Sequence, residues 1–355
     1  MVQEDYMRRC LELAGKGFGN VSPNPMVGAV IVCDGEIIGE GYHRKYGGPH
    51  AEVNAIASVS CPDRLSRSTI YVSLEPCCHY GKTPPCADLI LEKKIPHVVV
   101  CNRDPFPVVD GKGIEKLRAA GVTVENGLLE EQGRWLNRRF FTFHEKKRPY
   151  IFLKWAETKD GFIDRFRLSE EQEPLTISTP ETLHLSHLMR ATETAILVGP
   201  NTALLDNPSL RVRYAEGRNP VRVLIDRDLR VPTTAHLYDG TAHTIVFCRS
   251  VPAETYANVE FVAVDFDIDG RIDFSSCMAA LYERKIESLI VEGGKMTSQS
   301  FMDAGMWDEI RVERNHSLVI GSGVEAPKLG TLKDSYVSYS CQIIGENDIT
   351  YYRKV

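Results

Sequence analysis

The chain has 355 residues, of which 43% are hydrophobic and 25% are charged, and its formal net charge is -6. Such values are typical of a globular protein with roughly two domains, and they give no indication of a basic nucleic-acid-binding face. No apolar run approaches the ~20 residues of a membrane span. The first five residues lack the features of a secretion signal, so we expect a cytoplasmic protein whose ten cysteines are thiols or metal ligands.

The first half of the sequence predicts a hairpin followed by alternating helices and strands. Apolar residues at helical spacing predict a helix over 5–16, which Gly17 ends. Two apolar runs at 27–33 and 36–41 flank Asp34-Gly35, a pair typical of hairpin turns. The following elements are a short helix near His50 and then 69–74, 86–94, 97–101, 114–120 and 122–125. This order indicates an α/β layer structure with a largely parallel sheet.

A polar, basic run at 144–149 ends in proline, and we place the domain boundary there, giving domains 1–147 and 148–355. A second series of elements follows it. Strands are predicted at 151–156, 194–198, 221–225, 244–248, 259–264, 288–291 and 309–313, and helices at 180–189, 275–285 and 297–303. The segments 336–339 and 342–344 are expected to be late antiparallel strands.

The residues with the clearest chemistry are His50, Cys77 and Cys86. One imidazole and two thiolates suit a tetrahedral zinc ion with an open fourth position, which is typical of a catalytic site. Glu52 lies two residues beyond the histidine and can take a proton from a zinc-activated water and pass it to a leaving amine. His-x-Glu followed by Pro-Cys is the pattern of zinc deaminases. The sequence therefore predicts a hydrolytic zinc site.

Two other interpretations of this pattern stay open at this point. The motif can be accidental, since each part of it is common alone. The zinc can also be purely structural, with Cys78 or His79 as a fourth ligand.

The spacing of the cysteines narrows the family, because eight residues separate Cys77 from Cys86 where two are usual. This segment, residues 78–85, reads Cys-His-Tyr-Gly-Lys-Thr-Pro-Pro. Three further motifs precede it in the chain: 23–28 (Pro-Asn-Pro-Met-Val-Gly), 41–43 (Gly-Tyr-His) and 49–52 (Pro-His-Ala-Glu). Together they resemble the bifunctional riboflavin biosynthesis deaminase/reductase family over essentially the whole chain.

The resemblance implies a cytidine-deaminase-like three-layer domain followed by a dihydrofolate-reductase-like α/β domain. The first domain would use zinc to hydrolyse the 2-amino group of a diamino-pyrimidinone that carries a ribosylamino 5′-phosphate. The second would use NADPH to reduce the ribosyl group to a ribityl chain. A homo-oligomer, dimer or tetramer, is also implied, with a small-molecule substrate and neither nucleic acid nor membrane as partner.

The resemblance also implies particular contacts. Those with the substrate of the first domain are at Asn24, His43, Lys82, Asn102 and Asp104. Those with the substrate of the second domain are at Arg190, Leu210, Arg213 and Glu292. Contacts with NADPH are expected at Glu157, Thr176, Thr202, Asp206, Arg227, Gly293, Gly294, Lys295, Met296, Thr297 and Ser298.

Physical reasons support some of these expectations. Gly293-Gly294 leads from a strand into a helix expected to open near Thr297, a turn that suits a pyrophosphate. Arg190 and Arg213 carry planar donor groups that suit phosphate. The residue that selects NADPH over NADH is left open between Arg227 and Arg249, both near strand ends.

Departures from the family pattern at Phe162, Thr176 and 167–173 leave a weakened reductase as an alternative. Two rival functions are also considered. A deaminase that flips a nucleic-acid base would want a basic surface, against which the acidic balance argues. A non-catalytic zinc-binding protein would have no use for the proton carrier at Glu52.

Overall fold

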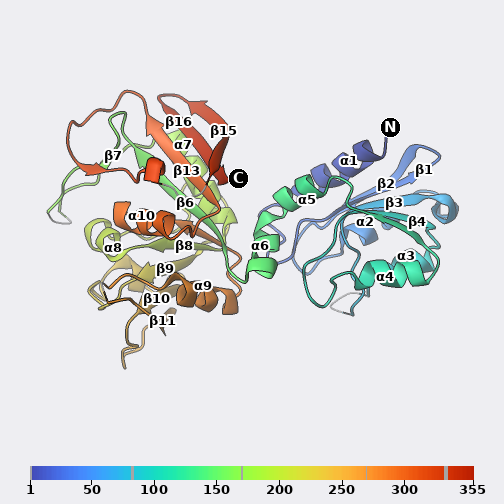
Figure 1. Cartoon of the computed structure of the whole chain (residues 1–355), viewed down its shortest axis with the longest axis horizontal. Coiled ribbons are helices and arrows are strands. Elements are labelled where there is room, and N and C mark those ends of the chain that lie inside the picture. Colours follow the sequence, from blue (N-terminus) through green and yellow to red (C-terminus); the bar gives the residue numbers. More distant parts are fainter. Residues whose placement is uncertain (1, 81–83, 169–170, 269, 332–334) are drawn as a thin grey trace. The chain divides into compact units, whose positions relative to one another are not determined.

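The structure is a computed structural model that describes residues 2–80, 84–168, 171–268, 270–331 and 335–355 (Figure 1). The chain divides into two compact units, Met1–Lys146 and Lys147–Val355. None of the helices in the described ranges combines the length and apolar character that a membrane span requires.

The first unit contains a five-stranded sheet in the order β2-β1-β3-β4-β5. Its strands are β1 (Gly28–Cys33), β2 (Glu36–Tyr42), β3 (Thr69–Leu74), β4 (His97–Asn102) and β5 (Thr123–Asn126). The hairpin of β1 and β2 is confirmed, but β1 also runs antiparallel to β3. Only the β3-β4 and β4-β5 pairs are parallel. The expectation of a largely parallel sheet therefore holds for four of the five strands, which run in one direction, and fails for β1, which runs against both of its neighbours.

Helices cover both faces of this sheet, which gives the three layers (Figure 1). They are α1 (Gln3–Gly15), α2 (Ala51–Ala57), α3 (Cys86–Glu92), α4 (Lys112–Ala119), α5 (Glu130–Leu136) and α6 (Arg138–Lys146), with a 3-10 turn at Pro62–Arg67. In β1, Ile31 packs with α2, α3 and α4, whereas Val30 and Val32 pack with α1. This alternation explains why a strand buried on both faces is apolar throughout.

Two helices, α5 and α6, were not predicted from the sequence. Residues 144–146, which look like a polar linker, form the last turn of α6. Only part of this turn is polar surface: Glu145 and Lys146 are exposed, whereas the His144 ring packs edge-on against Phe140 and Phe143.

The second unit contains a nine-stranded sheet in the order β11-β10-β9-β8-β12-β6-β13-β16-β15. Its strands are β6 (Tyr150–Glu157), β8 (Ala195–Val198), β9 (Val221–Ile225), β10 (Thr244–Cys248), β11 (Val259–Ala263), β12 (Ser288–Val291), β13 (Glu309–Asn315), β15 (Tyr336–Ile344) and β16 (Asn347–Lys354). All pairs from β11 to β13 are parallel. The antiparallel end of the sheet is confirmed, but the two short strands expected there form one, β15. A separate pair joins β7 (Phe162–Asp164) to β14 (Val324–Glu325).

Helices also cover both faces of this second sheet: α7 (Pro180–Thr192), α8 (Pro200–Asp206), α9 (Phe274–Glu283) and α10 (Lys295–Asp303). Short 3-10 turns lie at His236–Tyr238 and Leu329–Thr331. Leu281 and Phe301, from α9 and α10, lie in one core cluster, and Ala203 from α8 lies in another. In such folds ligands bind at the carboxyl ends of the parallel strands.

Candidate active sites

Three metal-ligating side chains converge in the first unit. His50 immediately precedes α2, Cys77 follows β3, and Cys86 is the first residue of α3. His50 Nδ1 lies 3.6 Å from Cys77 Sγ and 3.3 Å from Cys86 Sγ. In the described ranges these three form the only group of His, Cys, Asp or Glu ligand atoms that all lie within 4.8 Å of one another. The sequence motif thus assembles as one cluster.

The chemistry of this cluster fits zinc. Hydrogen bonds from Cys86 and His50 hold the pKa of Cys77 well below its usual range, so a thiolate is favoured there. Neither alternative fourth ligand joins the cluster: Cys78 Sγ is directed to Val108 O at 4.0 Å, and the His79 ring packs edge-on against Phe106. Three ligands with an open position are the arrangement of a catalytic zinc site.

Glu52 stands beside the ligands in the first turn of α2, with only 3% of its surface exposed. Burial raises the pKa of its carboxyl to about 7, and the negative charge of Cys77 adds to this effect. A carboxyl with such a pKa can both hold and release a proton near neutral pH, which general acid–base catalysis needs.

Two of the expected substrate residues lie next to the ligand cluster. The His43 ring stands edge-on to His50 with ring centres 5.6 Å apart. Its Nδ1 lies 3.0 Å from Pro49 O and therefore carries the proton, which leaves Nε2 to accept from Asn24 Nδ2 at 3.1 Å. Lys82 lies outside the described residues.

Asn102 and Asp104 follow β4, but the structure uses them differently. Asn102 Nδ2 donates to Glu130 O at 3.0 Å, so this side chain joins β4 to α5 rather than extending toward the ligands. Asp104 is buried, and its Oδ1 accepts a hydrogen bond from Phe106 N at 2.8 Å. Burial raises the pKa of Asp104 to about 7.

Glu75 organises this loop, a role that was not expected from the sequence. Its buried carboxylate accepts backbone hydrogen bonds from Asp104 N (3.2 Å), Gly111 N (2.9 Å), Gly113 N (2.9 Å) and Ile114 N (3.1 Å). Because Glu75 is two residues before Cys77, it ties the loop that carries Asp104 to the metal-binding segment. The sequence offered no signal for this, since the four donors are backbone groups.

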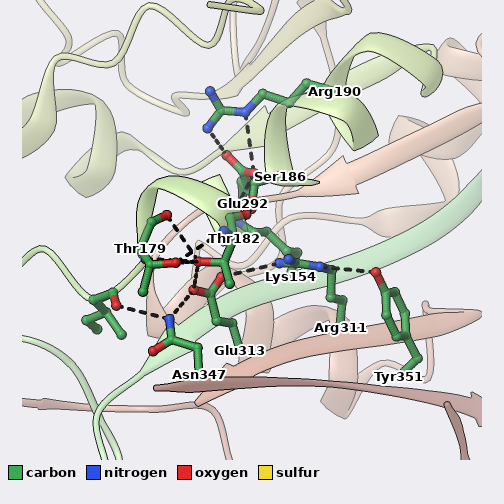
Figure 2. A network of polar contacts seen from close by, with 11 residues as sticks. Lys154, Thr179, Thr182, Ser186, Arg190, Glu292, Arg311, Glu313, Asn347 and Tyr351 are labelled. Carbon is green, nitrogen blue, oxygen red and sulfur yellow. Dashed lines mark hydrogen bonds and ion pairs between the residues drawn. The ribbon is translucent and has the colours of Figure 1, made fainter. Parts of the chain in front are cut away.

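In the second unit a buried ion cluster joins two neighbouring strands to α7 (Figure 2). The Glu292 carboxylate, after β12, contacts Lys154 Nζ of β6 at 3.1 Å and forms an ion pair with Arg190 of α7. Burial alone would raise the pKa of Glu292, but the positive charges of Arg190 and Lys154 lower it to about 2.

A second group of polar contacts supports this cluster from β13 (Figure 2). Glu313 accepts from Thr182 Oγ1 of α7 at 2.5 Å and from Asn347 Nδ2 at 2.6 Å. Arg311 lies beside Lys154 on the adjacent strand and donates from Nε to the Tyr351 hydroxyl at 3.3 Å. These contacts fix α7, and therefore Arg190, against the sheet.

The other expected substrate residues reach this cluster through His187, which sequence reasoning missed. His187 Nδ1 accepts from Arg213 N at 3.0 Å, and its Nε2 lies 3.4 Å from Arg190 Nη1. The helical spacing of His187 and Arg190, three residues apart, was an available signal. Leu210 is buried in the core with a positive φ of 53° and shapes the loop that returns to Arg213.

A cavity of about 810 Å³ lies at the carboxyl ends of β8 and β12. Six expected cofactor residues line it: Thr202, Asp206, Gly294, Lys295, Met296 and Thr297. The helix after Gly294 begins at Lys295 rather than near Thr297, so its first turn borders the cavity. Such a helix start suits a pyrophosphate, and the volume lies in the range of cofactor sites. The residues present therefore fit a dinucleotide.

Five expected cofactor residues do not line this cavity. Glu157 accepts from Trp155 Nε1 at 2.9 Å and lines a separate cavity of about 210 Å³. Thr176 is exposed, and Arg227 donates to Asp228 at 2.7 Å. Gly293 packs so closely that an added Cβ would lie 2.7 Å from Gly199 N, and Ser298 Oγ donates to Gly293 O at 3.1 Å. Gly293 and Ser298 therefore support the residues that line the cavity without lining it themselves.

Several cavity-lining residues were not expected, among them Arg167, Arg230 and the loop 321–325. The loop is held by Asp160, which accepts from Gly321 N at 2.8 Å. Such residues come from segments distant in the chain, so no local sequence pattern predicts that they meet.

The folds and sites define the class of this protein: a zinc-dependent deaminase unit joined to an α/β unit with a dinucleotide cavity. Comparison with known families agrees. The family described as "Cytidine and deoxycytidylate deaminase zinc-binding region" matches residues 1–102, and "RibD C-terminal domain" matches residues 149–334.

Relatives are similar over nearly the whole chain. The riboflavin biosynthesis protein RibD of Aquifex aeolicus is 39% identical over 330 residues, which cover 93% of this chain and 91% of that protein. RibD of Escherichia coli is 34% identical, with 88% of this chain and 87% of that protein covered. This chain belongs to the RibD family of riboflavin biosynthesis proteins, and it is a zinc- and NADPH-dependent enzyme with deaminase and reductase activities.

Solved structures show the same two-unit fold. A diaminohydroxyphosphoribosylaminopyrimidine deaminase/5-amino-6-(5-phosphoribosylamino)uracil reductase from Thermotoga maritima matches with a TM-score of 0.84 and 38% identity, covering 99% of this chain and 98% of that one. Acinetobacter baumannii RibD matches with a TM-score of 0.85 and 29% identity, over the same shares of the two chains.

Proposed function

We propose that this enzyme first hydrolyses the 2-amino group of 2,5-diamino-6-(ribosylamino)-pyrimidinone 5′-phosphate and then reduces the ribosyl group to a ribityl chain with NADPH. The observation that carries the first step is the cluster of His50, Cys77 and Cys86 with the buried carboxyl of Glu52 beside it. The name of the Thermotoga maritima relative supports the choice of pyrimidine substrate.

In the deamination, water replaces the amino group and ammonia leaves. A zinc ion on His50, Cys77 and Cys86 would supply the Lewis acidity that makes a water molecule nucleophilic at neutral pH. Glu52 takes the proton of that water and delivers it to the departing amine, for which a pKa of about 7 is suited. We assign the Asn24 amide, held by His43, to hydrogen bonding with the substrate.

In the reduction, NADPH held in the cavity beside α10 would supply the hydride, and water would supply the proton that completes the reduction. We assign Lys154, Arg190 and Glu292 to binding of the substrate's sugar phosphate. They place two cations and a carboxylate at the end of β12, the strand whose carboxyl end borders this cavity. The phosphate suits Arg190 and Arg213, and Glu292 can accept a hydrogen bond from a sugar hydroxyl.

A small-molecule substrate is proposed rather than a nucleic acid, which the net charge of -6 supports. A cytoplasmic location and a homo-oligomer of two or four chains stay predictions.

The test measures both reactions with purified enzyme. Ammonia should be released from the diamino-pyrimidinone phosphate but not from cytidine, and NADPH should then be oxidised by the deaminated product. Glu52→Gln should lower ammonia release by roughly 10²–10⁴-fold while zinc content stays near one per chain.

NADPH oxidation with supplied deaminated substrate is the internal control, and Glu52→Gln should leave it unchanged. Ammonia release that survives in Glu52→Gln would contradict the proposed role of the carboxyl. A failure to oxidise NADPH would contradict the second step.

A further inference from the structure

Three cationic side chains line the dinucleotide cavity: Arg167, Arg230 and Lys295. Two of them already have strong partners. The side chain of Arg167 is only 5% exposed and bonds to Asp164 at 2.7 Å, to Asp206 and to two backbone carbonyls. Lys295 Nζ contacts Glu325 Oε2 at 3.0 Å. Their charges are therefore largely compensated within the protein.

Arg230 differs from both. It is exposed, and in the described part of the chain its guanidinium forms no ion pair and only one long hydrogen bond, from Nη2 to Asn201 Oδ1 at 3.5 Å. Asn201 also lines the cavity. Arg230 is thus the cavity's cation with donors still available to an anionic ligand.

The turn that carries Arg230 is fixed by a buried carboxylate. Asp226, fully buried after β9, accepts from Arg230 N at 3.0 Å and from Val231 N at 2.8 Å. Leu229, directly before Arg230 in this turn, has a positive φ of 51°. Arg230 is therefore presented from a rigid backbone, whereas its long side chain remains adjustable.

The sheet order decides which part of NADPH meets Arg230. The nicotinamide must lie near the substrate residues Lys154 of β6 and Glu292 after β12. Gly294 and the start of α10 suit the pyrophosphate. β9 lies beyond β8, two strands from β12, which is about 10 Å at ordinary strand spacing. The adenosine half therefore points toward β9 and Arg230.

We propose that Arg230 binds the 2′-phosphate of NADPH and thereby selects NADPH over NADH. The planar guanidinium suits bidentate binding of phosphate, and NADH offers only a hydroxyl at this position. This inference rests on the proposed reductase function. It replaces the two candidates from the sequence, since Arg227 is bonded to Asp228, Arg249 lies 4.0 Å from the same carboxylate, and neither lines the cavity.

The test titrates the full chain with NADPH, NADH, 2′,5′-ADP and 5′-ADP by calorimetry, without turnover. Arg230→Ala should weaken NADPH and 2′,5′-ADP by about 10- to 100-fold and leave NADH and 5′-ADP unchanged. Arg230→Lys should recover part of the loss, since it keeps the charge without the planar donors. Arg227→Ala is the matched control and should bind all four nucleotides as the unaltered chain does.

Unchanged preference for 2′,5′-ADP over 5′-ADP in Arg230→Ala would overturn the inference, as would a loss of that preference in Arg227→Ala instead. Retained 5′-ADP binding shows that each variant is folded. If the unaltered chain binds NADH and NADPH equally, the selection fails while the reductase function stands. If it binds neither, the reductase function fails and the inference with it.

Discussion

Two buried carboxylates, Glu75 and Glu292, are compensated in different ways. Glu75 accepts four backbone N–H hydrogen bonds and fixes a loop, whereas Glu292 is paired with two cationic side chains. Leaving a buried carboxylate unpaired is expensive, so each arrangement constrains its surroundings strongly. The ion pair of Glu292 with Arg190 also positions His187, whose Nε2 lies 3.4 Å from Arg190 Nη1.

The lowered pKa of His187 predicts how the stability of the reductase unit depends on pH. Burial, and then the charge of Arg190, lower the pKa of His187 from 6.5 to about 4. The unfolded chain therefore binds more protons than the folded chain between these values, and stability should fall as the pH drops from about 6.5 to about 4. Hydrogen exchange of the β6 and β12 amides at several pH values measures this.

His187→Gln should flatten that decline, because it removes the titrating group. His184→Gln, on the exposed side of the same helix, is the control and should keep it. An equal decline in His187→Gln and the unaltered chain would show that another group is responsible.

At the scale of elements, close backbone contacts hold helices on sheets. Gly28 begins β1 directly beneath α1, and a Cβ added there would lie 2.8 Å from Ala14 N and closer still to Cys10 O. Since both neighbours are helix backbone, they cannot move aside independently. The position requires glycine because of proximity, and not because of a left-handed conformation.

Gly28→Ala should therefore destabilise the deaminase unit by at least about 1–3 kcal/mol, the usual cost of overpacking. Urea unfolding of the full chain, followed by loss of the zinc site, measures this. Gly15→Ala at the end of α1 is the matched control, because an added Cβ there meets nothing within 4 Å. Equal midpoints for the two variants would refute the close packing of α1 on β1.

Elements were predicted best where the local pattern was strong. The apolar runs of β1, β3, β4 and most strands of the second unit are recognisable, because burial on both faces demands apolar residues throughout. The helix α5 was missed because it is short and Gly133 is its only buried residue, and α6 was missed because charged residues flank its buried phenylalanines. The direction of β1 against β3 was not predictable either, since pairing depends on contacts between distant segments.

At the scale of the whole molecule, the two activities have separate cores. The buried clusters around Ile31 and Val30 contain only residues of the first unit, and those around Leu153 and Ile196 only residues of the second. The cluster of His50, Cys77 and Cys86 belongs to the first unit, and the cavity that fits a dinucleotide belongs to the second.

Removal of zinc with a chelator should therefore abolish ammonia release and leave NADPH binding by the same sample unchanged. Added zinc should restore the first activity, and added magnesium should not, because thiolate ligands do not suit it. The measurement is ammonia release and NADPH titration before and after chelation. NADPH binding that disappears together with ammonia release would show that the two units depend on one metal.

The sequence by itself was enough to predict the His50, Cys77 and Cys86 cluster, the glutamate proposed as proton carrier, and the family. These residues sit in short motifs at a helix start and at a strand end, so their spacing along the chain is enough to recognise them. Only the tertiary structure decided how the reductase residues are grouped. Lys154 and Glu292 meet because β6 and β12 are neighbours in the sheet, and α7 brings Arg190 and His187 to them. Arg230 and Arg227 are three residues apart, yet the fold turns one into the cavity and binds the other to Asp228.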